Sequence, residues 1–126
     1  MKRTAQRLLV GTTLAALALV PAVDAGAKGK AKQRKAPTKT VKIFDNYYEP
    51  AKLTVRKGTT VVWKWPAVTG DSHDVTLEKG PKGVKKFQSE VAGSAYTYKR
   101  KLKVPGRYDI ICTLHEEMTM KIVVRR

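Results

Sequence analysis

From Thr40 onward the chain alternates hydrophobic and polar residues in short runs. Val41 and Ile43 flank Lys42, and Leu53 and Val55 flank Thr54, which is the two-residue period of a half-buried β-strand. Six further β-rich runs lie at 59–65, 73–77, 87–91, 96–102, 108–113 and 119–124. About eight short strands separated by Gly, Pro and Asp, without a long helical repeat, predict an all-β fold, a sandwich of two antiparallel sheets packed face to face.

Aromatic residues occur within these runs. Period two places Val61, Trp63 and Trp65 on one face of their strand. Together with Tyr96, Tyr98 and Tyr108, such aromatics also suit a surface that stacks carbohydrate or bases. Their recurrence at strand spacing favours packing in the core of the sandwich.

The first 27 residues do not share this pattern. Lys2, Arg3 and Arg7 precede an apolar run from Leu8 to Val20, and small residues follow, which is the order found in a secretory signal peptide. The run is shorter than the roughly 20 residues that span a bilayer, which argues against an uncleaved anchor. We therefore expect a signal peptide at 1–27, cleaved after Ala25 or Ala27, and a protein that is secreted, periplasmic or held at the cell surface.

Residues 28–39 read KGKAKQRKAPTK and contain no large apolar side chain. We expect a basic flexible linker here, ahead of a single domain at 40–126. The whole chain has a formal net charge of +16, and removal of 1–27, which holds three basic residues and Asp24, leaves +14. This charge favours an anionic partner, either a protein with an acidic surface or an anionic cell-envelope surface. An exported chain without zinc-finger or base-stacking motifs is not expected to bind nucleic acid.

The chain has one cysteine, Cys112, and two histidines, His73 and His115. A lone cysteine in an oxidising compartment suggests an intermolecular disulfide, a reactive thiol or a protected metal ligand. His115 follows Cys112 by three residues in the segment CTLHEEM, which ends at Met118. Taken singly, each residue is more readily explained as core or surface; taken together, they form one pattern.

A thiolate, two imidazoles and a thioether are the ligands of a type 1 blue copper site, with three strong donors and a weak axial sulfur. Thiolate and thioether hold Cu(I), and imidazole binds both oxidation states. Zinc is the main competitor, but a neutral thioether is a poor donor for it. We therefore expect one copper ion held by His73, Cys112, His115 and Met118.

The chain resembles the plastocyanin-like cupredoxins over nearly all of residues 40–125. YYEPAKLTVRKGTTVVWKW is similar to the opening strands of that family, SHDV to its first-histidine motif and VPGRYDIICTLHEEM to its ligand loop. The resemblance implies a Greek-key β-sandwich, with His73, Cys112 and His115 as equatorial ligands and Met118 as the axial one. The two residues between His115 and Met118 are similar to the short ligand loop of amicyanin, whereas Met120 would fit the longer loop of plastocyanin.

Three positions depart from the family pattern. The family has Asn after the first histidine, where this chain has Asp74, and Asn after the tryptophan strand, where this chain has Pro66. Met120 stands where a small residue is common. Groups next to a metal site tune its reduction potential, so Asp74 bears on the redox chemistry, while none of the three changes removes a ligand.

These observations predict a monomeric one-electron carrier, without catalytic residues, that cycles between Cu(I) and Cu(II) and meets a redox partner protein. A multicopper enzyme would need further histidines. The alternative function is a copper carrier or accessory protein of the cell envelope that does not shuttle electrons. A metal-free basic adhesion or structural protein would require the four-residue pattern to be accidental.

Overall fold

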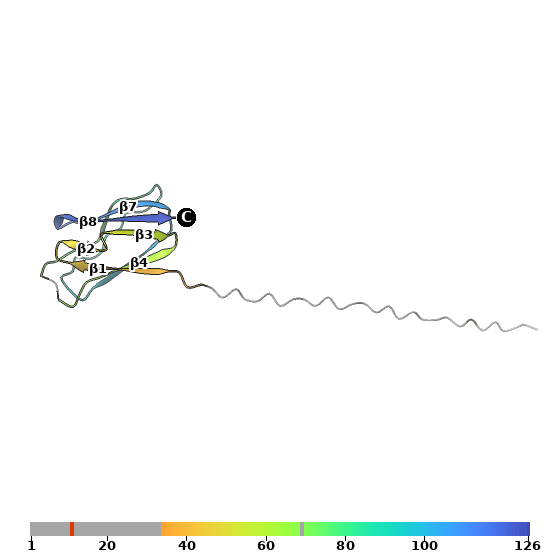
Figure 1. Cartoon of the computed structure of the whole chain (residues 1–126), viewed down its shortest axis with the longest axis horizontal. Helices are drawn as coiled ribbons and strands as arrows, with labels where there is room; N and C mark the ends of the chain where they lie inside the picture. Colours follow the sequence, from red (N-terminus) through yellow and green to blue (C-terminus); the bar gives the residue numbers. More distant parts are fainter. Residues whose placement is uncertain (1–10, 12–33, 69) are drawn as a thin grey trace, which may run out of the picture. The chain divides into compact units, whose positions relative to one another are not determined.

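A computed structural model describes Gly11 and residues 34–68 and 70–126 (Figure 1). The expected signal segment at 1–27, apart from Gly11, and residues 28–33 of the expected linker lie outside the described residues. Within the described part there are no helices, hence none that could cross a membrane. Its eight strands are β1 (Thr38–Phe44), β2 (Tyr47–Glu49), β3 (Lys52–Arg56), β4 (Thr59–Lys64), β5 (Thr76–Lys79), β6 (Thr97–Leu102), β7 (Gly106–Cys112) and β8 (His115–Arg125).

The strands form two four-stranded sheets, in the orders β2-β1-β4-β6 and β3-β8-β7-β5. The expected sandwich is confirmed, but the sheets are mixed rather than antiparallel. β1 runs parallel to β4, and β3 runs parallel to β8, while the other neighbours are antiparallel. Hydrophobic alternation shows which face of a strand is buried, but it does not reveal the direction of the neighbouring strand.

One hydrophobic core lies between the sheets. Trp63 of β4 and Tyr48 of β2 pack from the first sheet, and Tyr108 of β7 and Ile122 of β8 from the second, all with at most 1% exposure. The expectation that strand aromatics serve the core is confirmed for the two tryptophans and Tyr108, while Tyr96 and Tyr98 are partly buried against it. Burial of one large apolar side chain stabilises a fold by roughly 1.5–3 kcal/mol, so this core can hold the sandwich together.

One predicted strand is absent and one observed strand was not predicted, so the total number agrees. Residues 87–91 contain a single isolated bridge, Gln88 with Thr76, instead of a continuous strand. The strand that was not predicted is β2, whose three residues are too few to show the alternation of hydrophobic and polar positions. Asn46, with φ of 67°, adopts the left-handed conformation that asparagine tolerates in tight turns and turns β1 back into β2. This turn places Asp45 at one end of the sandwich.

The borders of other elements also differ from the sequence pattern. β1 begins at Thr38, two residues before the expected start of the domain, and β5 begins at Thr76, not at His73. β8 begins at His115, four residues before the expected Thr119. The early start of β8 places the segment after His115 in a regular strand, which changes the setting of Met118.

Candidate metal centre

His73 reaches the site from the segment before β5. Its backbone N–H donates to the carbonyl of Ala92, and the N–H of Ala92 donates to the carbonyl of His73, both at 3.0 Å. This reciprocal pair replaces the continuous strand expected here and fixes the backbone at this point. The His73 side chain is completely buried.

Cys112 and His115 come from the two sides of one hairpin. Cys112 ends β7, His115 begins β8, and the two residues pair across the turn formed by Thr113 and Leu114. Cys112 shares the inward face of its strand with Tyr108, and both side chains are buried. A two-residue turn therefore brings the only thiol of the chain beside the second imidazole.

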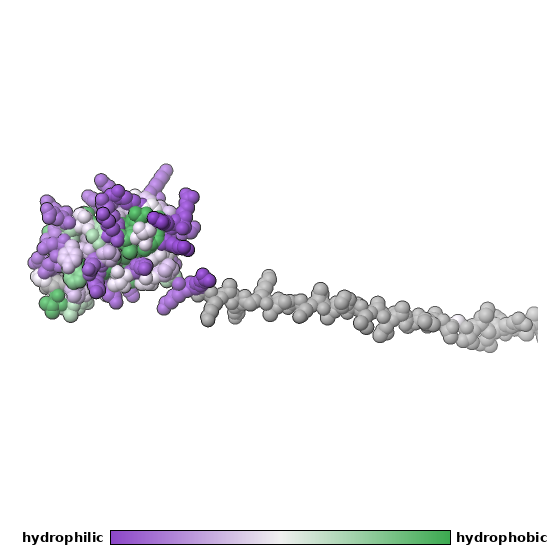
Figure 2. Space-filling model, in the orientation of Figure 1, coloured by the Kyte–Doolittle hydropathy of each residue, from purple (hydrophilic) through white to green (hydrophobic). Residues whose placement is uncertain are grey.

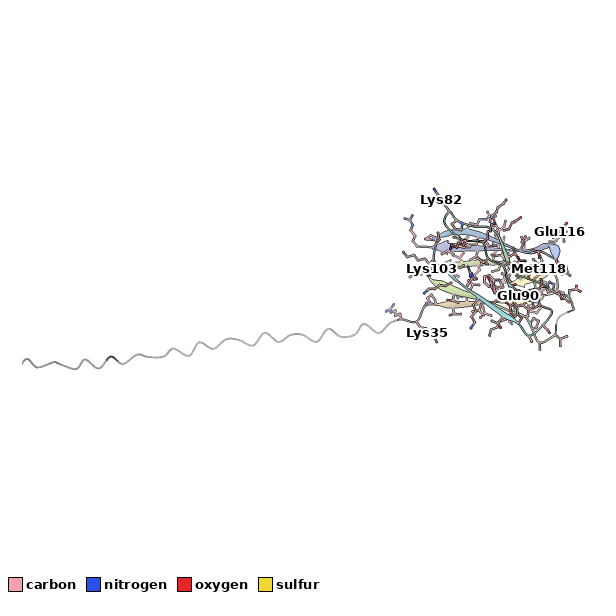
Figure 3. All side chains as sticks on the ribbon, turned by 180° about the vertical axis from the view of Figure 1, so that it is seen from behind. Lys35, Lys82, Glu90, Lys103, Glu116 and Met118 are labelled. Carbon is pink, nitrogen blue, oxygen red and sulfur yellow. The ribbon has the colours of Figure 1, made fainter. Side chains whose placement is uncertain are left out.

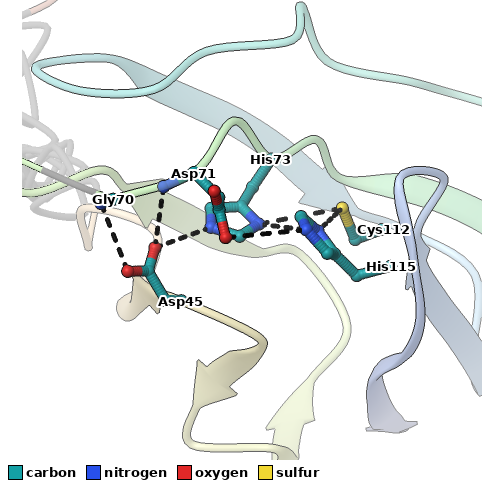
Figure 4. Close-up of polar contacts among 6 residues, drawn as sticks. All are labelled: Asp45, Gly70, Asp71, His73, Cys112 and His115. Atoms are coloured by element: carbon teal, nitrogen blue, oxygen red, sulfur yellow. Dashed lines mark hydrogen bonds and ion pairs between the residues drawn. The ribbon is translucent and has the colours of Figure 1, made fainter.

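The three side chains converge at one point (Figure 4). Nδ1 of His73 lies 3.2 Å from Nδ1 of His115, and Sγ of Cys112 lies 4.0 Å from the first nitrogen and 3.6 Å from the second. All three candidate ligand atoms lie within 4.8 Å of one another. Residues 39 positions apart in the sequence thus present two nitrogens and one sulfur to a shared space, the donor set of a trigonal copper site.

Asp74 connects the two segments that carry the donors. Its Oδ1 accepts the backbone N–H of Thr113 at 2.7 Å, and its Oδ2 accepts the Thr113 hydroxyl at 2.6 Å, Nε2 of Gln88 at 2.8 Å and the Thr76 hydroxyl at 3.3 Å. The residue is fully buried, and the Tyr48 hydroxyl donates to its backbone carbonyl at 2.6 Å. A carboxylate suits this position because four donors face it and only acceptors are needed.

The ionisation of Asp74 follows from the same contacts. Burial opposes the charged form, but the hydrogen bonds from Thr113 and Gln88 outweigh it and hold the pKa of this carboxyl below its usual value. Asp74, the residue after His73, is therefore an anion that ties this segment to Thr113, the residue after Cys112.

Asp45 is a site residue that the sequence pattern did not reveal. Its Oδ1 lies 3.2 Å from Nε2 of His73, on the side of the ring that faces away from Cys112. The only available signal was an Asp-Asn pair directly after an expected strand, which indicates a turn but not what the turn contacts.

Both methionines considered as axial ligand point inward. Met118 is 0% and Met120 is 1% exposed, and both belong to β8 and to the hydrophobic core. The run expected at 119–124 left Met118 outside the regular strand, but β8 already begins at His115, so Met118 lies in the strand and packs in the core. Met120 pairs with Ile110 in the middle of the β7–β8 ladder, whereas Met118 lies closer to the hairpin. Met118 as axial ligand remains a prediction.

Comparisons with known proteins agree with this fold and donor set. The family model described as copper binding proteins, plastocyanin/azurin family, matches residues 36–125. Amicyanin-alpha of Methylorubrum extorquens is 31% identical over 117 residues, which cover 93% of this chain and 97% of that protein. Amicyanin of Paracoccus versutus is 32% identical over 79 residues, or 61% of this chain and 57% of that protein.

Solved structures show the same relationship. A mutant of amicyanin with Cu(I) has a TM-score of 0.60 and 28% identity, over 70% of this chain and 82% of that chain. A copper-containing nitrite reductase from Thermus scotoductus has a TM-score of 0.58 and 27% identity, over 71% of this chain but 22% of that chain. The family match extends over most of the chain and includes every residue of the donor cluster. The chain therefore belongs to the plastocyanin/azurin family of copper-binding proteins.

Proposed function

We propose that this protein carries single electrons through one copper ion held by His73, Cys112, His115 and Met118. Family membership and the cluster of two imidazoles and a thiol make it a blue copper electron-transfer protein. The observation that carries the proposal is the convergence of Nδ1 of His73, Nδ1 of His115 and Sγ of Cys112 within 4.8 Å. The bound ion would supply a one-electron couple, and the protein would supply a site with little freedom to rearrange.

Several features of the chain support that limited freedom. His73 is held by its backbone pair with Ala92, and Cys112 and His115 face each other in a hairpin. Asp74 joins these two segments through the backbone and hydroxyl of Thr113. Ligands anchored in this way keep similar positions in both oxidation states, which favours rapid electron transfer.

His115 is the most exposed of the four proposed ligands, so we propose that electrons leave the site through it. Its side chain is 25% exposed, whereas His73 is fully buried, and the neighbouring Leu114 is 50% exposed. An apolar residue beside the exposed imidazole allows close approach of a partner without the cost of desolvating charged groups. We propose that the partner contacts the edge of His115 next to Leu114.

Charge is distributed unevenly over the described part of the chain. All acidic residues of the described part lie in four segments, residues 43–51, 65–78, 87–98 and 108–120. These four segments contain no Lys or Arg. Figure 3 shows Lys35, Lys82 and Lys103 toward one end of the domain and Glu116 toward the other. Hydrophilic side chains cover much of the face in Figure 2, with hydrophobic residues exposed in smaller patches.

This distribution refines the partner that we propose. The net charge would steer the domain toward a redox partner with an acidic surface, or toward an anionic cell-envelope surface, over distances set by the Debye length. Near His115, however, Asp71 and the two residues after His115 are acidic. A complementary partner would therefore have a neutral or basic contact point surrounded by acidic groups.

The remaining parts of the proposal concern location and assembly. We propose that residues 1–27 direct export, that 28–39 form a basic linker, and that the mature protein is a periplasmic, secreted or cell-surface monomer. We further propose that it is not an enzyme. The chain contains two histidines, and both belong to the cluster, so no histidine remains for a second copper centre of the multicopper type.

Electrochemistry on copper-loaded protein from Lys28 to Arg126 tests the proposed function. This length includes all eight strands and the core. We expect reversible one-electron reduction and rapid self-exchange. Retention of Cu(I) followed by transfer to an apo-partner, with slow self-exchange, would instead support copper delivery.

A matched pair of variants tests the route through His115. Leu114→Lys and Val123→Lys each add one positive charge at an exposed hydrophobic residue, 50% and 41% exposed. We expect slower self-exchange for Leu114→Lys and little change for Val123→Lys. Equal rates in the two variants would contradict a contact surface at Leu114.

A further inference from the structure

The turn between β1 and β2 brings a carboxylate to the buried histidine (Figure 4). Oδ1 of Asp45 lies 3.2 Å from Nε2 of His73 and accepts the backbone N–H of Asp71 at 3.1 Å. Oδ2 accepts the backbone N–H of Gly70 at 3.2 Å. The carboxylate is thus held by two backbone amides from the segment that leads to His73.

Gly70 is suited to this arrangement because it has no side chain. A Cβ built at this residue would collide with Oδ2 of Asp45, so a larger residue would displace the carboxylate or the backbone. The contact with Asp45 is therefore part of a close-fitting local structure and not a chance meeting of two exposed side chains. Asp45 is 45% exposed, while the ring that it contacts is fully buried.

The contact determines which nitrogen of His73 carries the proton. An ionised carboxylate only accepts hydrogen bonds, so the neutral ring must place its proton on Nε2 to bond with Asp45. A carboxyl group is ionised at neutral pH, and two backbone amides hold this one in place as the acceptor. Nδ1 is then left with its lone pair, and Nδ1 is the atom directed toward Cys112 and His115.

We propose that Asp45 is a positioning residue that holds His73 in the Nε2–H tautomer and places a negative charge behind it. The second part rests on the proposed copper function. A carboxylate on the outer nitrogen makes an imidazole a stronger donor, and its charge favours Cu(II) over the less positive Cu(I). Asp45 therefore lowers the reduction potential of the site and strengthens Cu(II) binding.

Asp71 provides a matched control at the other histidine. Its Oδ2 lies 4.0 Å from Nε2 of His115, and its side chain is 61% exposed. Solvent screens such a charge more than one hydrogen-bonded to a buried ring. Asp71→Asn preserves the backbone N–H that Asp45 accepts, so it removes a nearby charge without disturbing the His73 contact.

Two variants separate the charge of Asp45 from its hydrogen bond. Asp45→Asn retains an oxygen that can accept from Nε2 of His73 but removes the charge and places an amide near the N–H of Gly70. Asp45→Ala removes both the charge and the acceptor. Nitrogen-15 NMR of the histidine rings in the apo-protein at neutral pH reports the tautomer, and voltammetry of the copper-loaded protein reports the reduction potential.

In the wild-type apo-protein we expect His73 as the Nε2–H tautomer, retained in Asp45→Asn and lost to a mixture in Asp45→Ala. We expect Asp45→Asn to raise the reduction potential more than Asp71→Asn while the copper–thiolate band persists, and Asp45→Ala to bind Cu(II) more weakly. A wild-type Nδ1–H tautomer, or equal potentials for wild type and Asp45→Asn, would overturn the proposal. If the wild type takes up no copper, the proposed function fails, while the NMR measurement still decides the tautomer.

Discussion

Asp74 allows a quantitative test of how the site is held together. Replacing it with alanine leaves the backbone N–H of Thr113 without its acceptor and removes a charged partner from the Thr113 hydroxyl. Both bonds are part-buried, and a hydrogen bond to a charged group contributes about 1.5–3 kcal/mol. Gln88 and Thr76 can turn toward other partners. We therefore expect Asp74→Ala to lower the free energy of unfolding of the apo-protein by about 3–5 kcal/mol.

Asp74→Asn distinguishes this explanation from a simple loss of packing. The amide oxygen can keep the bond from the Thr113 N–H, and the amide nitrogen then replaces Oδ2, next to three donors. The two threonine hydroxyls can rotate to accept, and the Gln88 amide can turn its oxygen inward, so neutral hydrogen bonds replace charged ones. We expect a cost of about 1–2 kcal/mol, less than that of alanine.

Urea unfolding followed by far-UV circular dichroism measures both changes. The apo-protein from Lys28 to Arg126 avoids any contribution from bound metal. Thr76→Val is a suitable control, because it removes the longest of the four bonds, at 3.3 Å, and should cost no more than about 1 kcal/mol. A cost below 1 kcal/mol for Asp74→Ala, or equal costs for the alanine and asparagine variants, would refute the role assigned to the carboxylate.

Three further predictions follow from the site and the fold. Met118→Leu should shift the reduction potential and the visible spectrum, while Met120→Leu should change stability by less than about 1.5 kcal/mol; the reverse pattern in spectra and urea unfolding would assign the axial role to Met120. Gly106→Ala should destabilise the fold by about 1–3 kcal/mol, because φ is 136° and a Cβ would lie 2.5 Å from Cγ of Pro81; thermal unfolding unchanged from wild type would contradict this. The rate of electron transfer with an acidic partner should fall between low and physiological salt in stopped-flow measurements, and a constant rate would count against electrostatic steering.

The sequence was most informative where the chemistry of the residues and the two-residue period of the strands point to the same conclusion. The β-rich run at 108–113 is a strand that buries Tyr108, Ile110 and Cys112, and the rarity of histidine and cysteine singled out the three donors. It was less informative about strand direction and strand ends, because parallel pairing of β1 with β4 depends on how the chain crosses between sheets. The two-residue period also could not decide whether Met118 or Met120 is the axial ligand, since residues two apart on a strand share a face.

The contacts around the donors were beyond the reach of the sequence pattern. Asp45 and His73 are 28 residues apart, and their contact depends on a turn after β1 and on a glycine at 70 that allows close approach. Asp74 was recognised as a departure from the family pattern, but three of its four donors belong to Gln88 and Thr113, which only the fold brings to it. Hydrogen-bond networks of this kind are set by tertiary structure and leave no periodic signal.

Copper titration of residues 28–126 tests the proposed copper site most directly. Protein from Lys28 to Arg126 is titrated with Cu(II) and followed by visible absorption and electron paramagnetic resonance, alongside Cys112→Ser, whose hydroxyl cannot form the copper–thiolate bond. We expect one copper per chain with an intense thiolate-to-copper band in the wild type, and a folded Cys112→Ser variant without that band. Absence of copper uptake by the wild type, or an unchanged blue band in Cys112→Ser, would contradict the proposed copper site.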